Sequence, residues 1–196
     1  AATFGEDAHP DVSLHTHCLA DYMIPLRRGD WGGVAALMRS SAERLRRAGA
    51  ELLICPDNTI HQAIEEARAQ TPLPWLHIAD VVVDEARRQV LRRLGILGTR
   101  YLMEGPVYRD ACARGGLAQV VPGVEDRQRT HVLIFDELVK GVVRGEGRAA
   151  LLGIIDRLRD AGCDGVVLGC TELPLIVRSE EAALPVLDST RLLARA

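Results

Sequence analysis

The sequence predicts an α/β fold built on parallel sheets, and three observations lead to this prediction. Apolar, strand-like runs alternate with amphipathic, helix-like segments along the 196 residues. The clearest run, GVVL at 165–168, is continuously apolar, which is typical of strands that helices cover on both faces. Polar residues follow several of the runs directly, and the ligands of such sheets bind at the carboxyl ends of strands. We therefore expect functional residues at strand ends.

The expected elements follow from the period of the apolar residues and from the Gly and Pro residues that interrupt it. Strands are expected at residues 12–17, 51–55, 75–78, 93–97, 118–121, 165–168 and 184–187. Helices are expected between them, at residues 31–48, 60–68, 81–92, 107–114, 125–143 and 148–161.

Two stretches of the chain repeat one pattern, which indicates two related lobes. RRAGAELLICPDNTIH at 46–61 and RDAGCDGVVLGCTELP at 159–174 share Arg, Ala-Gly, an apolar strand, a polar tip with Thr and then a helix. We expect one lobe from residues 1–85 with 182–196 and a second from 86–181. The first residues lack an initiator methionine and are typical of a helix that leads into a strand, so we expect that a first strand is missing from the chain.

Composition and charge exclude several classes of function. The net charge is −3, and the Arg-rich stretches at 44–47 and 87–93 fall in helix-like segments, so we expect solvated helix faces and no nucleic-acid site. The apolar runs are too short for a membrane span, and no signal peptide is expected.

Five cysteines without a CxxC motif argue against zinc and against a redox dithiol, and free thiols indicate the cytoplasm. His15 and His17 share a strand face but have no third ligand nearby, so no metal site is expected.

The tip after residues 165–168 is Gly169-Cys170-Thr171-Glu172. Gly169 permits close approach of a ligand, and backbone N–H groups beyond a strand end favour a thiolate at Cys170. Thr171 offers a hydroxyl group and Glu172 an acid or an acceptor. A buried, inert cysteine is the alternative, but the surrounding residues favour a reactive one.

The tip after residues 51–55 is Asp57-Asn58-Thr59, followed by His61. Asp57 and Asn58 are good helix caps, and capping is compatible with ligand binding. His61 can either face the ligand or stack on the first helical turn. A further small polar tip, Gly98-Thr99-Arg100, follows residues 93–97.

The sequence resembles the aspartate/glutamate racemase superfamily, and most closely its aspartate racemase branch. The resemblance is carried by the tips at 57–59 and 169–172, by GILGTRYLMEGPVY at 95–108 and by FDELVKG at 135–141. The resemblance covers nearly the whole chain in order. It implies two pseudo-symmetric lobes, each a parallel sheet flanked by helices, with the active-site cleft between them. It also implies a homodimer that uses neither metal nor pyridoxal phosphate.

The family pattern carries a cysteine at each tip, and the two cysteines act on opposite faces of the substrate's α-carbon. Cys170 matches the second cysteine, whereas Asp57 stands where the first belongs, before Asn58 and Thr59. The resemblance implies that Asn58, Thr59, Thr99 and Thr171 hold the carboxylate and amino groups of an amino-acid substrate. Cys55 lies two residues too early to replace the missing base.

The prediction is therefore a cofactor-independent amino-acid racemase or epimerase, an isomerase whose activity is impaired or altered. The carboxylate of Asp57 disfavours acidic substrates relative to neutral or cationic ones. Two alternatives stay open: a single-cysteine decarboxylase or isomerase of the same superfamily, and a catalytically degenerate homologue that binds an amino acid.

Overall fold

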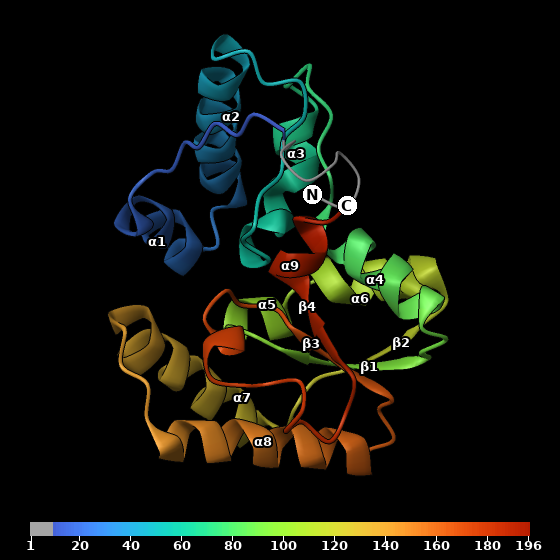
Figure 1. Cartoon of the computed structure of the whole chain (residues 1–196). Helices are drawn as coiled ribbons and strands as arrows, with labels where there is room; N and C mark the ends of the chain where they lie inside the picture. The colour runs from blue at the N-terminus through green and yellow to red at the C-terminus, as the bar shows by residue number, and fades with distance from the viewer. Residues whose placement is uncertain (1–9) are drawn as a thin grey trace. The chain divides into compact units, whose positions relative to one another are not determined.

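A computed structural model describes residues 10–196, which divide into two compact units (Figure 1). The first unit holds the described residues up to Leu53 together with Ala63–Trp75, and the second holds Ile54–Gln62 together with Leu76–Ala196. The strand expected ahead of the chain and residues 1–9 lie outside this description.

The second unit is built on a four-stranded parallel sheet with the strand order β2-β1-β3-β4. The strands are β1 (Arg93–Leu97), β2 (Ala118–Val120), β3 (Gly165–Leu168) and β4 (Val186–Asp188). β1 and β3 form the centre, where Leu94 pairs with Gly165 and Leu97 with Leu168. Both central strands are almost fully buried, which confirms the prediction from their continuous apolar runs.

Helices cover both faces of this sheet (Figure 1). Successive strand residues point to opposite faces, so the central strands supply two separate cores. Leu97, Val166 and Leu168 pack with the apolar side of α8 (Gly145–Asp160) and with the residues after β3. Leu94, Ile96 and Val167 pack instead with α4 (Ile78–Arg88) and α6 (Val107–Gly115).

The remaining helices of this unit are short or irregular. They are η1 (Thr59–Ala63, whose last residue lies in the first unit), α5 (Arg100–Glu104), α7 (Val124–Val132), the π-helix η2 (Leu133–Glu137), η3 (Leu138–Lys140), η4 (Leu173–Leu175) and α9 (Ser189–Leu193). The single helix expected at 125–143 is thus an α-helix that continues as a π-helical turn and a 3-10 turn before Gly141, whose φ is 74°.

The first unit is helical in its described part. It contains α1 (Leu19–Arg28), α2 (Trp31–Arg47) and α3 (Ile64–Arg68). Asp30 caps α2, because its carboxylate accepts a hydrogen bond from the backbone N–H of Gly33 at 2.8 Å. The sequence pattern missed α1, which contains Pro25 near its end.

Three expected strands do not form, and the reason is missing strand partners. Residues 12–17 are irregular, and residues 51–55 and 75–78 contribute only an isolated parallel bridge between Leu53 and Trp75. A strand is stable only when neighbours satisfy its backbone groups, and the described residues around this bridge provide none. Ile78 instead begins α4, since the ring of His77 accepts a hydrogen bond from Asp80 N at 3.4 Å.

The division into two lobes at residues 85/86 and 181/182 stays a prediction. β4 pairs with β3 within the sheet of the second unit. Within the described residues, a parallel sheet is present in the second unit only, so a sheet in each lobe is not observed.

Candidate functional site

The candidate site lies at the carboxyl ends of β1 and β3, where the topology of the sheet changes direction. After β1 the chain turns toward α6 on one face, whereas after β3 it turns toward Leu173 and Ile176, which pack on the other face. Adjacent strands whose connections leave on opposite faces open a crevice at their carboxyl ends, which is the usual ligand position in such sheets. The tips expected to be functional, at Thr99 and Cys170, flank this point.

Two glycines allow the tips to approach each other closely. A Cβ on Gly169 would lie 2.5 Å from Leu102 Cδ2 and 3.0 Å from the carbonyl oxygen of Leu97. A Cβ on Gly98 would lie 2.7 Å from the same leucine carbon and 3.1 Å from the carbonyl oxygen of Gly169. The backbones after β1 and β3 can therefore pack together only without these side chains.

Cys170 is half-buried beyond β3 and is held as a thiol. Its Sγ donates to Glu172 Oε2 at 2.9 Å, and Thr171 Oγ1 donates to the same oxygen at 2.8 Å. Burial raises the pKa of Cys170 well above its usual value, and the hydrogen bond and charge of Glu172 and the charge of Asp57 raise it further. The group at this tip is thus a proton donor in the free protein.

Asp57 caps the turn that follows it and remains accessible to solvent. Its Oδ1 accepts a hydrogen bond from Ile60 N at 3.0 Å, at the start of η1. Burial of the carboxyl group by the atoms packed around it raises the pKa of Asp57, and the charge of Glu172 raises this pKa further. The hydrogen bonds from the backbone of Ile60 and Thr59 lower the pKa and so oppose the rise. Capping therefore engages one carboxylate oxygen and leaves acceptor capacity for a ligand.

A second thiol lies close to this carboxylate. Burial raises the pKa of Cys55 to about 12, and the charge of Asp57 contributes to the rise. Cys55 therefore stays protonated at neutral pH and is unsuited to act as a base.

Asn58 is buried, and its side-chain amide takes part in a chain of hydrogen bonds. Ser189 Oγ donates to the carbonyl oxygen of Leu168 at 2.8 Å, so it can accept from Asn58 Nδ2 at 2.9 Å. Asn58 Oδ1 then accepts from the phenol of Tyr108 at 2.7 Å. Burial raises the pKa of Tyr108, which keeps that phenol a donor. The chain ties the Asp57 tip to α6 and to the ends of β3 and β4.

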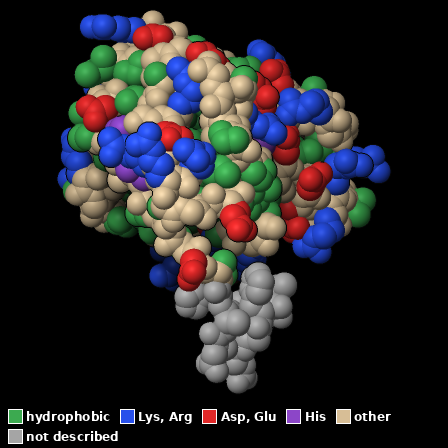
Figure 2. All heavy atoms as spheres, turned by 90° about the horizontal axis from the view of Figure 1, so that it is seen from above, with side chains coloured by type: hydrophobic (Ala, Val, Ile, Leu, Met, Phe, Trp, Pro, Cys, Tyr) green, Lys and Arg blue, Asp and Glu red, His purple; other side chains and the backbone are tan. Residues whose placement is uncertain are grey.

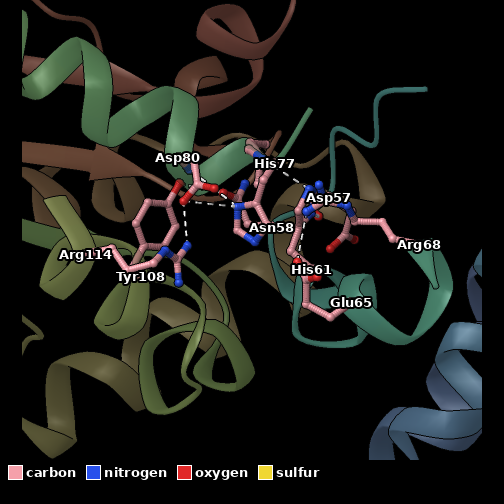
Figure 3. A network of polar contacts seen from close by, with 10 residues as sticks. Asp57, Asn58, His61, Glu65, Arg68, His77, Asp80, Tyr108 and Arg114 are labelled. Carbon is pink, nitrogen blue, oxygen red and sulfur yellow. Dashed lines mark hydrogen bonds and ion pairs between the residues drawn. The ribbon is translucent and has the colours of Figure 1, made fainter. Parts of the chain in front are cut away.

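Thr59 and Thr99 join the same tip to β1. Their hydroxyl oxygens lie 3.0 Å apart, both residues are buried, and Thr99 Oγ1 also accepts from Leu102 N at 3.2 Å. His61 is buried as well, and its Nδ1 lies 2.7 Å from the carbonyl oxygen of Asp57 (Figure 3). Its Nε2 lies 3.2 Å from Ile78 N.

The structure thus brings the predicted site residues into one place and adds two that the sequence pattern did not identify. All eight, from Asp57 to Glu172, belong to the second unit. Tyr108 and Ser189 were missed. Ser189 could have been predicted as a site residue, because Asp188-Ser189 is a polar tip after an apolar run. Tyr108 could not, because a tyrosine within a helical segment has no pattern that indicates a site.

The other predictions about partners concern charge, metals and membranes. Figure 2 shows basic side chains interspersed with acidic ones over the face that it presents. Among residues 10–196, no three His, Cys, Asp or Glu side chains form a group suited to a metal ion, and no helix is long and apolar enough to cross a membrane. All five cysteines are free thiols. A cytoplasmic location stays a prediction.

The fold and site define an α/β protein with a thiol and a carboxylate at the switch point of a parallel sheet. The family model for Asp/Glu/hydantoin racemases matches residues 2–196. The chain therefore belongs to the Asp/Glu/hydantoin racemase family, which confirms the resemblance seen in the sequence.

Solved structures share the fold over nearly the whole chain. A candidate Asp/Glu racemase from Yersinia pestis has a TM-score of 0.88 at 32% identity, covering 98% of this chain and 84% of that one. An aspartate racemase homologue from Pyrococcus horikoshii OT3 has a TM-score of 0.84 at 27% identity, covering 99% and 84%.

Three curated relatives are longer than this chain. The glutamate racemase of Aquifex aeolicus is 26% identical over 162 residues, which are 80% of this chain and 61% of that protein. A broad specificity amino-acid racemase of Bacillus subtilis is 23% identical over 154 residues, 79% of this chain and 66% of that protein. A second glutamate racemase, from Roseiflexus, is matched over 52% of its length. The chain thus spans about half to two thirds of these relatives.

Proposed function

We propose that this protein is a cofactor-independent amino-acid racemase or epimerase in which Asp57 and Cys170 exchange the proton at the substrate's α-carbon. The observation that carries the proposal is the pairing of one protonated thiol with one carboxylate at the switch point. The charge of Asp57 helps to raise the pKa of Cys170, so the two groups act on each other within one site. Racemisation needs an acid and a base on opposite faces of the α-carbon.

The proton transfers balance. The carboxylate of Asp57 takes the α-proton and becomes a carboxylic acid, while the electron pair of the C–H bond passes to the substrate carboxylate as an enediolate. Cys170 S–H then delivers its proton to the opposite face and becomes a thiolate. One negative charge is present on the pair before and after the reaction. The reverse direction starts from Asp57 protonated and Cys170 ionised, and exchange with water restores the resting pair.

The raised pKa of Asp57 suits this direction of transfer, because a carboxyl group with a raised pKa is a stronger base than an ordinary aspartate. The raised pKa of Cys170 makes the thiol a weak acid, which keeps its proton in place until a strongly basic enediolate forms beside it. The substrate's carboxylate would be held by hydroxyl and backbone N–H groups of Thr59, Thr99 and Thr171, which stabilise charge as the enediolate forms. Capping and hydrogen bonding already fix these groups.

The charges around the site favour neutral or cationic amino acids over aspartate and glutamate. Asp57 and Glu172 are both acidic and close enough for Glu172 to raise the pKa of Asp57. A second substrate carboxylate there would be repelled. The broad specificity named for the Bacillus subtilis relative is consistent with this range.

The test is exchange of the α-proton for deuterium in D₂O, followed by NMR over a panel of L- and D-amino acids. We expect exchange with both enantiomers of at least one neutral or cationic amino acid. Cys170→Ala should abolish it in at least one direction. Cys163→Ala is the matched control, because Cys163 lies before the opposite end of β3 and is buried in the core.

Three outcomes distinguish the proposal from its alternatives. Absence of exchange from folded protein with every amino acid contradicts it. Release of carbon dioxide from substituted malonates without Cα exchange supports a single-cysteine decarboxylase. Calorimetric binding of an amino acid without exchange supports a degenerate homologue. Gain of aspartate racemisation by Asp57→Cys would confirm that this position is that of the first catalytic cysteine. The homodimer stays a prediction that sedimentation can check.

A further inference from the structure

We propose that His61 is a positioning residue: its neutral ring fixes the peptide of Asp57 against the start of α4 and makes no contact with substrate. The inference about the ring's hydrogen bonds stands on geometry alone, and its kinetic consequence rests on the proposed function.

The partners of the two ring nitrogens determine the protonation state. Nδ1 lies 2.7 Å from the carbonyl oxygen of Asp57, and a carbonyl can only accept, so Nδ1 carries a hydrogen. Nε2 lies 3.2 Å from Ile78 N, and a backbone N–H can only donate, so Nε2 is the acceptor. The imidazole is therefore neutral and in its Nδ1–H form. Both nitrogens are engaged with backbone groups, which leaves neither for a substrate.

The surroundings of the ring favour the same state. His61 is 2% exposed, and its ring meets that of His77 edge to face with centroids 4.8 Å apart (Figure 3). Burial lowers the pKa of His61 to about 4, and the neighbouring charge of His77 contributes. The carbonyl groups of Asp57 and Leu76 and the carboxylate of Asp80 act in the opposite direction. Asp80 itself pairs with Arg114 at 2.6 Å, which reduces its influence on the ring.

The ring connects two elements that are otherwise separate in sequence. Asp57 precedes η1, whereas Ile78 is the first residue of α4, which packs on the central sheet. The rigid ring of His61 therefore holds the peptide of Asp57, the proposed base, at a fixed position relative to α4. Proton transfer needs its base placed within fractions of an ångström, and a displacement of about 1 Å can reduce the rate about 100-fold.

The first experiment is ¹⁵N NMR of the histidine ring nitrogens in the unmodified protein. We expect His61 to show a protonated Nδ1 and an unprotonated Nε2 at pH 7 and to titrate far below the exposed value, with a pKa of about 4. Because the folded pKa lies below the unfolded value of about 6.5, the stability that neutral His61 provides is complete above pH 6.5 and declines as the pH falls toward 4. An Nε2–H tautomer, or a ring that is charged at pH 7, would overturn the assignment.

The second experiment compares His61→Leu with His61→Asn in the Cα-exchange assay. Asparagine keeps an N–H group near the position of Nδ1 and can still donate to the Asp57 carbonyl, whereas leucine cannot. We expect kcat to fall about 10- to 100-fold in His61→Leu, to recover to within about 5-fold of the parent in His61→Asn, and KM to change by less than about 3-fold in both. A KM that rises in both variants with kcat unchanged would show that His61 binds substrate and would overturn the proposal.

The two experiments separate this inference from the proposed function. If the unmodified protein shows no Cα exchange, the proposed function fails while the tautomer still decides the role of the ring. If exchange occurs but the tautomer is Nε2–H, the positioning role fails and the proposed function stands. Should His61→Leu not fold, the tautomer and the kinetics of His61→Asn still give a decision.

Discussion

Removal of the Tyr108 hydroxyl group should destabilise the protein through Asn58. In Tyr108→Phe, the buried Oδ1 of Asn58 loses the donor that lies 2.7 Å away. Asn58 is 2% exposed and Tyr108 fully buried, so water has no ready access to replace the phenol. A buried acceptor left without a partner costs about 1–3 kcal/mol, and we expect a loss of about 2 kcal/mol in the free energy of unfolding.

The measurement is urea unfolding followed by circular dichroism, with the slope of the transition compared between variants. Tyr101→Phe is the matched control, because the Tyr101 ring contacts His131 and Arg100 and its phenol makes no hydrogen bond within residues 10–196. It should change the free energy of unfolding by less than about 0.5 kcal/mol. A Tyr108→Phe variant as stable as this control would refute the hydrogen-bond chain as a structural support of the tip.

The hydrogen bonds that link Tyr108, Asn58 and Ser189 should also affect activity. A double-mutant cycle between Tyr108→Phe and Ser189→Ala tests whether the two partners of Asn58 act together. Residues within one hydrogen-bond network show interaction energies of about 0.5–3 kcal/mol, whereas independent residues add. Additive effects of the two substitutions on stability and on Cα exchange would contradict a shared role in holding Asn58.

Three further changes have outcomes that the structure determines. Val90→Gly should stabilise the protein by about 1 kcal/mol, measured by thermal unfolding, because a β-branched residue there holds a φ of 62°; an unchanged Tm would contradict this strain. Gly169→Ala should lower the Tm by several degrees, since its Cβ would lie 3.0 Å from the carbonyl oxygen of Leu97; a parent-like Tm would mean that the tips have room. Glu172→Gln should lower the pKa of Cys170 and increase its alkylation by iodoacetamide at pH 8, because Glu172 raises that pKa through its hydrogen bond and charge; slower alkylation would show that Glu172 acts otherwise.

The quality of the sequence prediction differs between the two units. β1 and β3 were predicted with their observed bounds, because a continuous apolar run between a helix and a Gly-containing tip is compatible with few other structures. The run at 51–55 has a similar pattern but forms only one bridge residue, Leu53, in the described part. Apolar pattern specifies that a segment can pair, whereas pairing itself depends on a neighbouring strand.

The individual roles of the polar tip residues also depended on tertiary contacts. Asn58 was expected to hold the substrate, yet its amide groups are occupied by Tyr108 and Ser189, which are 50 and 131 residues away in sequence. The sequence left open whether His61 faces the ligand or stacks on the first helical turn. In the structure its two ring nitrogens contact the carbonyl oxygen of Asp57 and the backbone N–H of Ile78. A local sequence pattern does not predict which residues, distant in sequence, will form hydrogen bonds with a given side chain.

The sequence by itself determined the fold class, the family and the position of Cys170 beyond the end of β3, because these follow from local periodicity and from the order of short motifs. Only the tertiary structure decided that Asp57 and Cys170 belong to one compact unit and that Cys170 is a thiol held by Glu172. It also decided that Asn58 and His61 support the tip. These properties arise from burial and from hydrogen bonds between distant segments, which exist only after the sheet has assembled.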